Sequence, residues 1–254
     1  MKTVAIAIIC KTPEPGKSKT RLSPPLAPEQ CAAISSCFIR DLSANIGALA
    51  VTRPVVGVAL YTPAGSEERL ARLVPDDFAF VLQADGDLGA RLDAGIRDVL
   101  GRGHAGAIVV SSDSPTLPHA YFAEAVERLL AEDCVVLCPA IDGGYTFIGL
   151  SRPHPELFAD MPWSTEVVHA RTVAKARALG LPVYELPMWY DVDDRDTLAV
   201  LAADLAGEAL PFRREAPSRP APATAAFLAE LGPLAAPFAV PLDAAPAGRE
   251  AAAR

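Results

Sequence analysis

Apolar and polar positions alternate along most of the chain in a way that predicts strands and helices in turn. Short runs rich in β-branched residues are typical of buried strands, and stretches with helical periodicity lie between them. This alternation predicts an α/β fold with a mostly parallel sheet and helices on both faces, a three-layer sandwich. The expected strands are residues 3–9, 54–61, 78–83, 106–112, 134–140 and 181–187, and the expected helices are Pro28–Ile46, Ser66–Leu73, Leu88–Leu100, His119–Leu130, Thr165–Leu179 and Arg195–Leu205.

Two segments depart from the alternation. The stretch DGGYTFIGL, Asp142–Leu150, follows a strand through a Gly-Gly turn and is itself typical of a strand, which predicts a hairpin or an antiparallel addition to the sheet. From about Ala216 the composition shifts to Ala and Pro around a short apolar piece, Phe227–Leu231. We therefore expect one domain over residues 1–210 and a partly ordered Pro/Ala-rich extension over residues 211–254.

Composition and charge narrow the class of protein. The chain has 254 residues, of which 51% are hydrophobic and 21% charged, and its formal net charge is -8. These values indicate a core-forming domain and exclude a diffuse basic surface, so we expect no nucleic-acid partner. No apolar run approaches the ~20 residues that span a bilayer, so no membrane partner is expected either.

The number and spacing of the cysteines indicate the redox state of the cellular compartment in which the protein is expected. The chain has 5 cysteines, an odd count with no Cys-x-x-Cys pair, and three of them lie in apolar runs. They are interpreted as reduced core residues of a cytoplasmic protein. The apolar start, residues 3–9, is interpreted as a first strand because it is short and lacks a cleavage pattern. The assembly is left open, with a homodimer as one alternative.

The basic loop after the first strand is the first candidate site. The stretch CKTPEPGKSKTRL places Lys17, Lys19 and Arg21 beside Gly16, in a chain that is acidic overall. Loop amides and side-chain cations of this kind suit a polyphosphate, and arginine can bind one with two hydrogen bonds. The spacing is not that of a Walker loop or of G-x-G-x-x-G, so an ATPase or a dinucleotide dehydrogenase is disfavoured. The alternative is a solvated basic loop.

Aspartates near strand ends form the second group of candidates. Asp113 in VVSSDSPTL follows a strand, where it could hold Mg²⁺ or Mn²⁺, and the alternative is a helix cap. In YDVDDRDTL, Asp191 and Asp193 lie two apart, so in an extended segment they point the same way and could share a cation. Helix capping by Asp193 or Asp194 is the alternative there.

Two further stretches are candidates for binding. Gly86 and Gly89 in QADGDLGARL could contact a nucleotide through backbone groups, although a capped helix entry explains them as well. Trp163 in MPWSTEVV offers an aromatic face, with a hydrophobic staple as the alternative. No G-x-S-x-G elbow or metal-spaced histidine pair is present, so a hydrolase triad or a zinc site is disfavoured.

Six blocks in their order resemble a known family. The chain is similar to the small bacterial GT-A-like transferases called DUF2064, also labelled rSAM/selenodomain-associated transferase 1 or arsenosugar biosynthesis glycosyltransferase. More distantly, the first block resembles 2-phospholactate and molybdenum cofactor guanylyltransferases. The resemblance runs from Met1 to Leu205 and is carried by AIICKTPEPGKSKTRL, DGDLGARL, SSDSPTLP, PAIDGGYTFIGL, PWSTEVV and YDVDDRDTL.

The resemblance implies a nucleotide-diphospho-sugar transferase fold and roles for particular residues. It assigns the donor phosphates to the first loop, a metal ion to Asp113 with Asp193 as a second contact, and the acceptor side to Asp142 and its neighbours. In many GT-A enzymes the metal motif is Asp-x-Asp, whereas this chain has Ser-Asp-Ser there. The candidates are Asp142, Lys19 and Arg21 for catalysis; Lys11, Gly16, Lys17, Lys19, Arg21, Gly86 and Gly89 for the nucleotide; and Gly143, Gly144, Tyr145, Trp163, Ser164 and Thr165 for the acceptor.

The expected activity is group transfer with Mg²⁺ or Mn²⁺. In one alternative a glycosyl group moves from a nucleotide sugar to a small-molecule acceptor. In the second, an NTP is joined to a phosphorylated small molecule and pyrophosphate leaves, and the same loop and metal serve both. The Trp163 ring and the family label favour glycosyl transfer. A third alternative, of another class, is a non-catalytic nucleotide-binding regulatory module.

Overall fold

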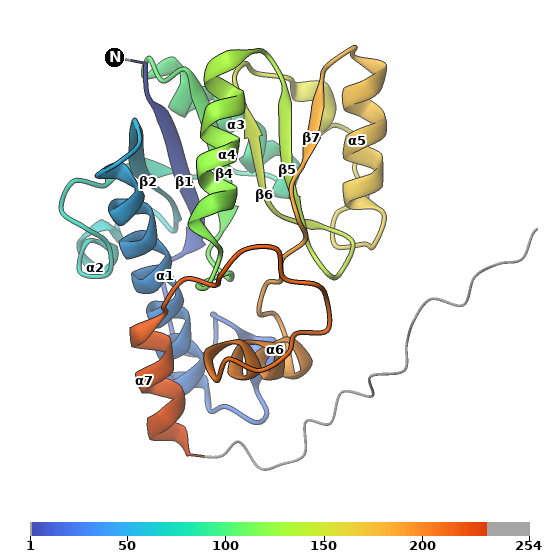
Figure 1. Cartoon of the computed structure of the whole chain (residues 1–254). Coiled ribbons are helices and arrows are strands. Elements are labelled where there is room, and N and C mark those ends of the chain that lie inside the picture. The colour runs from blue at the N-terminus through green and yellow to red at the C-terminus, as the bar shows by residue number, and fades with distance from the viewer. Residues whose placement is uncertain (1, 233–254) are drawn as a thin grey trace, which may run out of the picture.

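The computed structural model describes residues 2–232 and shows alternating strands and helices, as the sequence predicts (Figure 1). The strands are β1 (Val4–Lys11), β2 (Val55–Thr62), β3 (Ala79–Leu82), β4 (Gly106–Ser111), β5 (Val135–Pro139), β6 (Tyr145–Leu150) and β7 (Val183–Glu185). The helices are α1 (Pro28–Ala50), α2 (Glu67–Ala71), α3 (Leu88–Gly101), α4 (His119–Ala131), α5 (Val168–Ala178), α6 (Arg195–Leu205) and α7 (Pro222–Leu231).

Within residues 2–232 the strands form one sheet of order β3-β2-β1-β4-β6-β5-β7. Strand β6 pairs antiparallel with both β4 and β5, and the other pairings are parallel. The mostly parallel sheet is therefore confirmed, and the segment from Asp142 forms the hairpin that the Gly-Gly turn indicates. The order reverses between β1 and β4, so the chain leaves β1 toward β2 and leaves β4 toward β5 on the opposite side. In open α/β sheets ligands bind outside the carboxyl ends of the strands at such a reversal.

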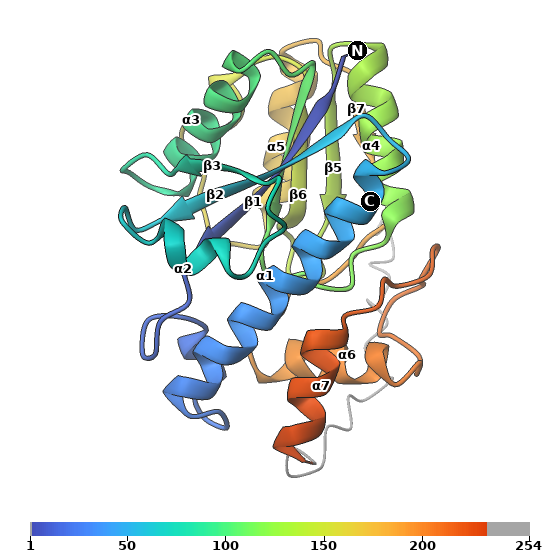
Figure 2. The ribbon, with the colours of Figure 1, turned by 90° about the vertical axis from the view of Figure 1, so that its left-hand side faces the viewer.

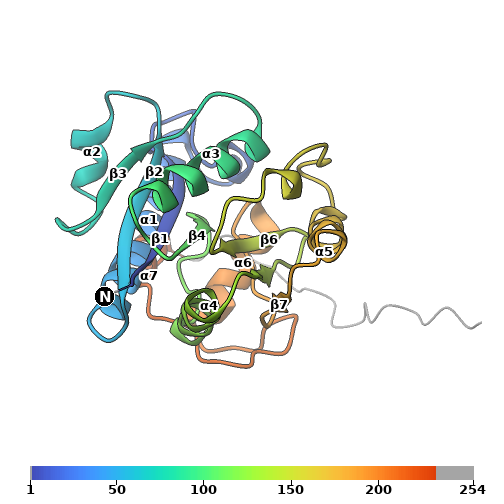
Figure 3. The same ribbon diagram turned by 90° about the horizontal axis from the view of Figure 1, so that it is seen from above.

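The core lies on both faces of the sheet because side chains of each strand alternate in direction. On one face Ile6 and Ile8 of β1 pack in a cluster with Phe38 of α1 and Phe122 of α4. On the other face the small side chain of Ala7 belongs to a cluster with residues of α3 and α5. Figure 3 shows α3 and α5 on one side of the sheet and α4 on the other, which confirms the three layers.

Some element boundaries differ from those that the sequence predicts. Helix α5 begins at Val168, three residues after the expected Thr165, because the chain turns at Ser164, whose φ is 62°. The Thr165 hydroxyl donates to the carbonyl of Pro162 and does not cap the helix. Asp194 caps α6, accepting from the amide of Thr197 at 3.0 Å, which confirms one of the two capping alternatives.

Residues 211–232 pack against the domain. Figure 2 shows α7 beside α1, where the buried Asp41 carboxylate accepts bonds from the amides of Ala223 and Thr224 at 3.0 and 2.8 Å. Phe212 lies against the rings of Trp189 and Tyr190. The boundary at residue 210 stays a prediction, and residues 233–254 of the predicted extension lie outside the described residues.

A second buried carboxylate ties the extension to the loops at the carboxyl end of the sheet. The Tyr190 hydroxyl donates to Asp204 at 2.7 Å and lies 2.8 Å from the hydroxyl of Thr116. Arg214 pairs with the same Asp204 carboxylate at 3.1 Å. The segments around residues 116, 190, 204 and 214 are therefore held together by one polar network in the interior.

The state of the cysteines and the apolar character of the helices can both be compared with the sequence predictions. All five cysteines are free, and four of them are buried, as expected of reduced core residues. No helix among residues 2–232 combines the length and apolar character that crossing a bilayer requires.

We predict that Asp41→Ala lowers the free energy of unfolding by about 2 kcal/mol, because it leaves buried donors of α7 without an acceptor. Urea unfolding followed by circular dichroism measures the change. Asp77→Ala, which removes an exposed carboxylate, is the matched control and should stay within about 0.5 kcal/mol of the unaltered protein. Equal stability of the two variants would show that α7 is not anchored by this contact.

Candidate active site

The loop between β1 and α1 folds on itself directly after the end of β1. The amides of Lys17 and Ser18 both donate to the carbonyl of Glu14 at 3.1 Å, and the Ser18 hydroxyl accepts from the Glu14 amide. Gly16 has a φ of 73°, a left-handed conformation that suits glycine at this turn. The loop is thus a structured turn at the carboxyl edge of the sheet.

The four basic side chains of this loop lie in different environments. Lys11 donates to the carbonyl of Lys17 at 3.3 Å, and Lys17 pairs with Glu14 at 2.9 Å while its side chain stays 60% exposed. Arg21 is 73% exposed and lies 3.9 Å from Asp193. Lys19 is different, because its side chain is only 8% exposed. Three cations therefore face solvent at the edge of a cavity, and one is buried.

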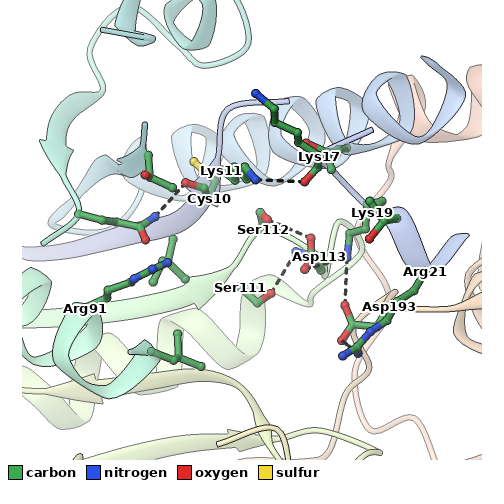
Figure 4. A pocket seen from close by; sticks show the side chains of 17 residues that line it. Cys10, Lys11, Lys17, Lys19, Arg21, Arg91, Ser111, Ser112, Asp113 and Asp193 are labelled. Carbon is green, nitrogen blue, oxygen red and sulfur yellow. Dashed lines mark hydrogen bonds and ion pairs between the residues drawn. The ribbon is translucent and has the colours of Figure 1, made fainter. Parts of the chain in front are cut away.

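The buried ammonium of Lys19 joins two carboxylates that are far apart in sequence. Its Nζ atom lies 2.8 Å from Asp113 Oδ2 and 3.1 Å from Asp193 Oδ1. Figure 4 shows the Lys19 side chain beside both aspartates. Burial by itself would lower the pKa of Lys19, but the charges of Asp113 and Asp193 outweigh it, so the pKa is raised. Lys19 is therefore a cation at neutral pH.

Backbone contacts bring Asp113 and Asp193 together. Asp113 follows β4, and its carbonyl accepts from the amide of Val192 at 2.9 Å. The Ser114 hydroxyl donates to the carbonyl of Tyr190 at 2.9 Å. Helix α4 begins only at His119, so Asp113 does not cap it and the capping alternative is excluded.

A basic cavity of about 420 Å³ opens beside this cluster. Five cations face it, and Figure 4 shows Arg91 across the cavity from Lys19. The amide group of Gln83 on its wall donates to the carbonyls of Cys10 and Leu60, both at 2.9 Å. The charged residues that line the basic cavity are Lys11, Lys17, Lys19, Arg21, Arg91, Asp113 and Asp193.

An acidic cavity of about 400 Å³ adjoins the basic one and shares Arg21, Asp113 and Asp193 with it. Arg21 is its one basic lining residue among those that the structure describes, against five carboxyl groups. Two aromatic rings and several hydroxyl groups complete its walls. The polar and aromatic residues that line the acidic cavity are Arg21, Ser111, Asp113, Asp142, Tyr145, Thr146, Trp163, Ser164, Thr165, Glu166, Asp191 and Asp193.

The turn between β5 and β6 shapes this acidic cavity. Asp142 accepts from the amide of Gly144 at 2.8 Å, which holds its carboxylate at the turn. Gly143 has a φ of 87°, and a Cβ atom there would lie 2.2 Å from the carbonyl oxygen of Glu166. Only glycine fits this close approach. The turn and the loop before α5 therefore pack directly on each other.

Carboxyl groups in the acidic cavity repel one another. Burial, the largest cause, raises the pKa of Asp191 from 3.8 to about 7, and the nearby charges of Asp193 and Asp142 add to the shift. Near neutral pH Asp191 therefore exchanges between its neutral and ionised forms. Such a shift in a cavity is typical of a functional site.

The candidate residues divide between the cavities and the scaffold around them. Trp163 packs against Gly89, where a Cβ atom would lie 2.8 Å from its indole nitrogen, so this glycine shapes the wall behind the ring. The carbonyl of Gly86 accepts from Arg91 at 2.9 Å. The candidates that line at least one cavity are Lys11, Lys17, Lys19, Arg21, Asp113, Asp142, Gly144, Tyr145, Trp163, Ser164, Thr165 and Asp193; those that line neither are Gly16, Gly86, Gly89 and Gly143.

Sequence reasoning did not select several residues that line the cavities. Gln83 and Arg91 both lie in the stretch QADGDLGARL, where only the two glycines are candidates, and Glu166 lies one residue beyond the candidate Thr165. The spacing of Asp191 and Asp193 predicts a cation site that both share. The structure instead places Asp191 in the acidic cavity alone, whereas Asp193 lines both cavities.

The carboxylates of Asp113 and Asp193 are the candidate ligands for a divalent cation. Within residues 2–232 no group of three or more His, Cys, Asp or Glu side chains is arranged to hold a metal ion. In nucleotide enzymes, however, one or two carboxylates hold Mg²⁺ together with substrate phosphates and water. Asp113 and Asp193 contact the same ammonium group, so both reach one position. These residues fit a cation that arrives with a phosphate ligand.

We predict that Asp191→Asn raises the free energy of unfolding by about 2 kcal/mol at pH 8 and leaves it almost unchanged at pH 4. The magnitude follows from about 1.36 kcal/mol per pKa unit, reduced because the side chain keeps some contact with solvent. Between the unfolded pKa of 3.8 and the folded value of about 7, the unfolded state ionises and the folded state does not. Stability associated with the protonated group is therefore lost as pH rises through this window.

Urea unfolding in EDTA at pH 4, 6 and 8 measures the effect of Asp191→Asn. Asp77→Asn, which alters an exposed carboxylate, is the control and should show no comparable pH dependence. A stabilisation that stays constant from pH 4 to pH 8 would mean that burial and the neighbouring carboxylates do not raise the pKa of Asp191.

Comparisons with solved structures bear out the fold. A candidate nucleotide-diphospho-sugar transferase from Desulfovibrio desulfuricans G20 is 29% identical, covers 91% of this chain and 95% of its own, and has a TM-score of 0.76. CMP:2-keto-3-deoxy-manno-octonic acid synthetase, solved with CTP, is 12% identical with a TM-score of 0.51, over 82% of this chain and 100% of its own.

A third structure has the same fold at lower identity. The 4-diphosphocytidyl-2C-methyl-D-erythritol synthase from Anaerococcus prevotii is 8% identical with a TM-score of 0.52, over 81% of this chain and 99% of its own. No curated protein matches the chain. The model of the bacterial family described as uncharacterized (DUF2064) matches residues 47–165. That match confirms the resemblance to DUF2064, and the chain has the α/β fold of nucleotide-diphospho-sugar transferases.

Proposed function

We propose that this protein is a transferase that takes a glycosyl group from a nucleotide-diphospho-sugar and passes it to a small-molecule acceptor. The observation that carries the proposal is the contrast in charge between two cavities that meet at Asp113 and Asp193. A basic cavity suits an anionic donor, and the adjoining acidic cavity suits a hydroxyl acceptor. The group would be transferred where they meet.

The donor side is supported by charge and by position. Lys17, Arg21 and Arg91 line the basic cavity, and cationic side chains of this kind bind diphosphates. The cavity lies outside the carboxyl ends of β1 and β4, at the reversal of strand order where doubly wound sheets bind nucleotides. The relative from D. desulfuricans, named for nucleotide-diphospho-sugar transfer, agrees with such a donor.

The acceptor side favours glycosyl over nucleotidyl transfer. In the nucleotidyl alternative the acceptor is itself phosphorylated, and its phosphate would have to enter a cavity with five carboxyl groups and one arginine. Like charges at such short range disfavour that complex. A neutral hydroxyl compound meets no such barrier, and Trp163 provides a surface on which a sugar ring can pack. The CMP:2-keto-3-deoxy-manno-octonic acid synthetase and the 4-diphosphocytidyl-2C-methyl-D-erythritol synthase share only the fold with this chain.

The chemistry would be divided between the two cavities. Asp142, oriented by the Gly144 amide, would take the proton from the acceptor hydroxyl as that oxygen attacks the anomeric carbon. The bond from that carbon to the diphosphate oxygen would break, and Arg21 would bind the departing diphosphate. Mg²⁺ or Mn²⁺ held by Asp113 and Asp193 would neutralise charge on the leaving group.

The products identify the reaction. Incubation with labelled nucleotide sugars and NTPs, with Mg²⁺ and a set of acceptors, should release a nucleoside diphosphate from a nucleotide sugar. Release of pyrophosphate from an NTP would establish the nucleotidyl alternative instead. Nucleotide binding that depends on Asp113 but leads to no turnover with any donor would point to a regulatory module.

We predict that Asp142→Asn lowers kcat by about 100-fold or more, the usual contribution of a positioned general base, with little change in nucleotide affinity. Asp77→Asn is the matched control and should leave both unchanged. The measurement is steady-state turnover together with calorimetric binding of the donor. Unchanged turnover in Asp142→Asn would remove this residue from the role of base.

A further inference from the structure

The bonding of the Lys19 ammonium is complete in the protein alone. Its three N–H donors are matched by three oxygen acceptors, Asp113 Oδ2 at 2.8 Å, Asp193 Oδ1 at 3.1 Å and the carbonyl of Val192 at 2.5 Å. A phosphate oxygen could become a partner only if one of these bonds were given up. Lys19 as it stands therefore serves the protein's own carboxylates and not a ligand.

The same two carboxylates are those that fit a divalent cation. The ammonium group occupies the space that both of them face, and two cations at that position would repel each other strongly. A metal ion and the ammonium of Lys19 are therefore alternative partners of Asp113 and Asp193. Without either, two partly buried carboxylates would face each other uncompensated.

We propose, building on the nucleotide-dependent function above, that Lys19 holds the place of the metal ion in the nucleotide-free protein and gives it up when nucleotide phosphates arrive. Phosphate oxygens offer the ammonium new acceptors in the basic cavity and offer the metal the extra oxygen ligands that it needs. The exchange makes strong metal binding conditional on the nucleotide.

Lys19 is placed so that its side chain can make this exchange. The ammonium group lies at the junction of the two cavities, because Asp113 and Asp193 line both and Lys19 lines the basic one. Its four-carbon stem is flexible, and a rotation about the stem moves the charge without moving the backbone. The backbone is anchored close by, since Leu22 is fully buried.

The exchange predicts reciprocal coupling between the two ligands. If a nucleotide raises the affinity for the metal by some factor, the metal raises the affinity for the nucleotide by the same factor. The metal-free, nucleotide-free state keeps its carboxylates neutralised and so remains folded without either ligand. A permanently bound metal would need neither Lys19 nor this coupling.

Binding of Mn²⁺ in the absence of nucleotide, followed by electron paramagnetic resonance, tests the inference. Lys19→Gln removes the internal cation, so we expect it to bind Mn²⁺ at least tenfold more tightly than the unaltered protein. Lys17→Gln is the matched control, because it removes the same charge from the same loop but from a side chain paired with Glu14. Its Mn²⁺ affinity should stay within about twofold of that of the unaltered protein, since exposed charges are screened. Equal Mn²⁺ affinity in all three proteins would overturn the inference.

Lysine acylation read by mass spectrometry gives a measurement on the unaltered protein. Without ligands Lys19 should react much more slowly than Lys17, given side-chain exposures of 8% and 60%. Excess Mg²⁺ should speed the reaction of Lys19 and not that of Lys17. Unchanged reactivity of Lys19 at Mg²⁺ concentrations that saturate the protein would contradict the exchange even if Lys19→Gln proved unable to fold.

These outcomes separate the inference from the proposed function. Tighter Mn²⁺ binding by Lys19→Gln in a protein that turns over no nucleotide donor would support the exchange of cations and refute the transferase. Turnover of a nucleotide sugar, with Mn²⁺ affinity unchanged in Lys19→Gln, would support the transferase and overturn the exchange.

Discussion

The ammonium group of Lys19, held between the carboxylates of Asp113 and Asp193, is the interaction on which the rest of the site depends. It joins the first loop, the end of β4 and the segment before α6, and Lys19 and Asp193 are 174 residues apart in sequence. Because both carboxylates line both cavities, this one contact sets where the basic and acidic cavities meet. A charge boundary at such a point suits transfer from an anionic donor to a neutral acceptor.

Hydrogen bonds in the interior of the protein position the segments that carry Asp113 and Asp193. The backbone bond from Val192 to Asp113 sets the distance between the two acidic segments. Behind it, the Tyr190 hydroxyl bonds to the buried Asp204, which Arg214 of the C-terminal extension also reaches. The extension is therefore linked through one buried network to the segment that carries Asp193. Buried polar groups that are fully paired in this way tend to specify a single arrangement.

Local sequence patterns predicted the elements well, because each strand and helix carries its own periodicity and most boundaries carry a turn or a cap. The exception near Ser164 has a tertiary cause, since the loop there packs on Gly143, far away in sequence. The candidate side chains at strand ends could also be found, because parallel strands bring their carboxyl ends to one edge. What no local pattern contains is the pairing of Lys19 with Asp113, or the wall formed by Gln83 and Arg91, because these depend on loop conformations.

The central claim is that a diphosphate binds in the basic cavity beside a cation on Asp113. Calorimetric titration with pyrophosphate, in the presence and absence of Mg²⁺, tests it without any assumption about the base or the sugar. We expect pyrophosphate to bind more tightly in the presence of Mg²⁺, and we expect this Mg²⁺ effect to be lost in Asp113→Asn. Absence of pyrophosphate binding under both conditions, or an Mg²⁺ effect that survives in Asp113→Asn, would contradict it.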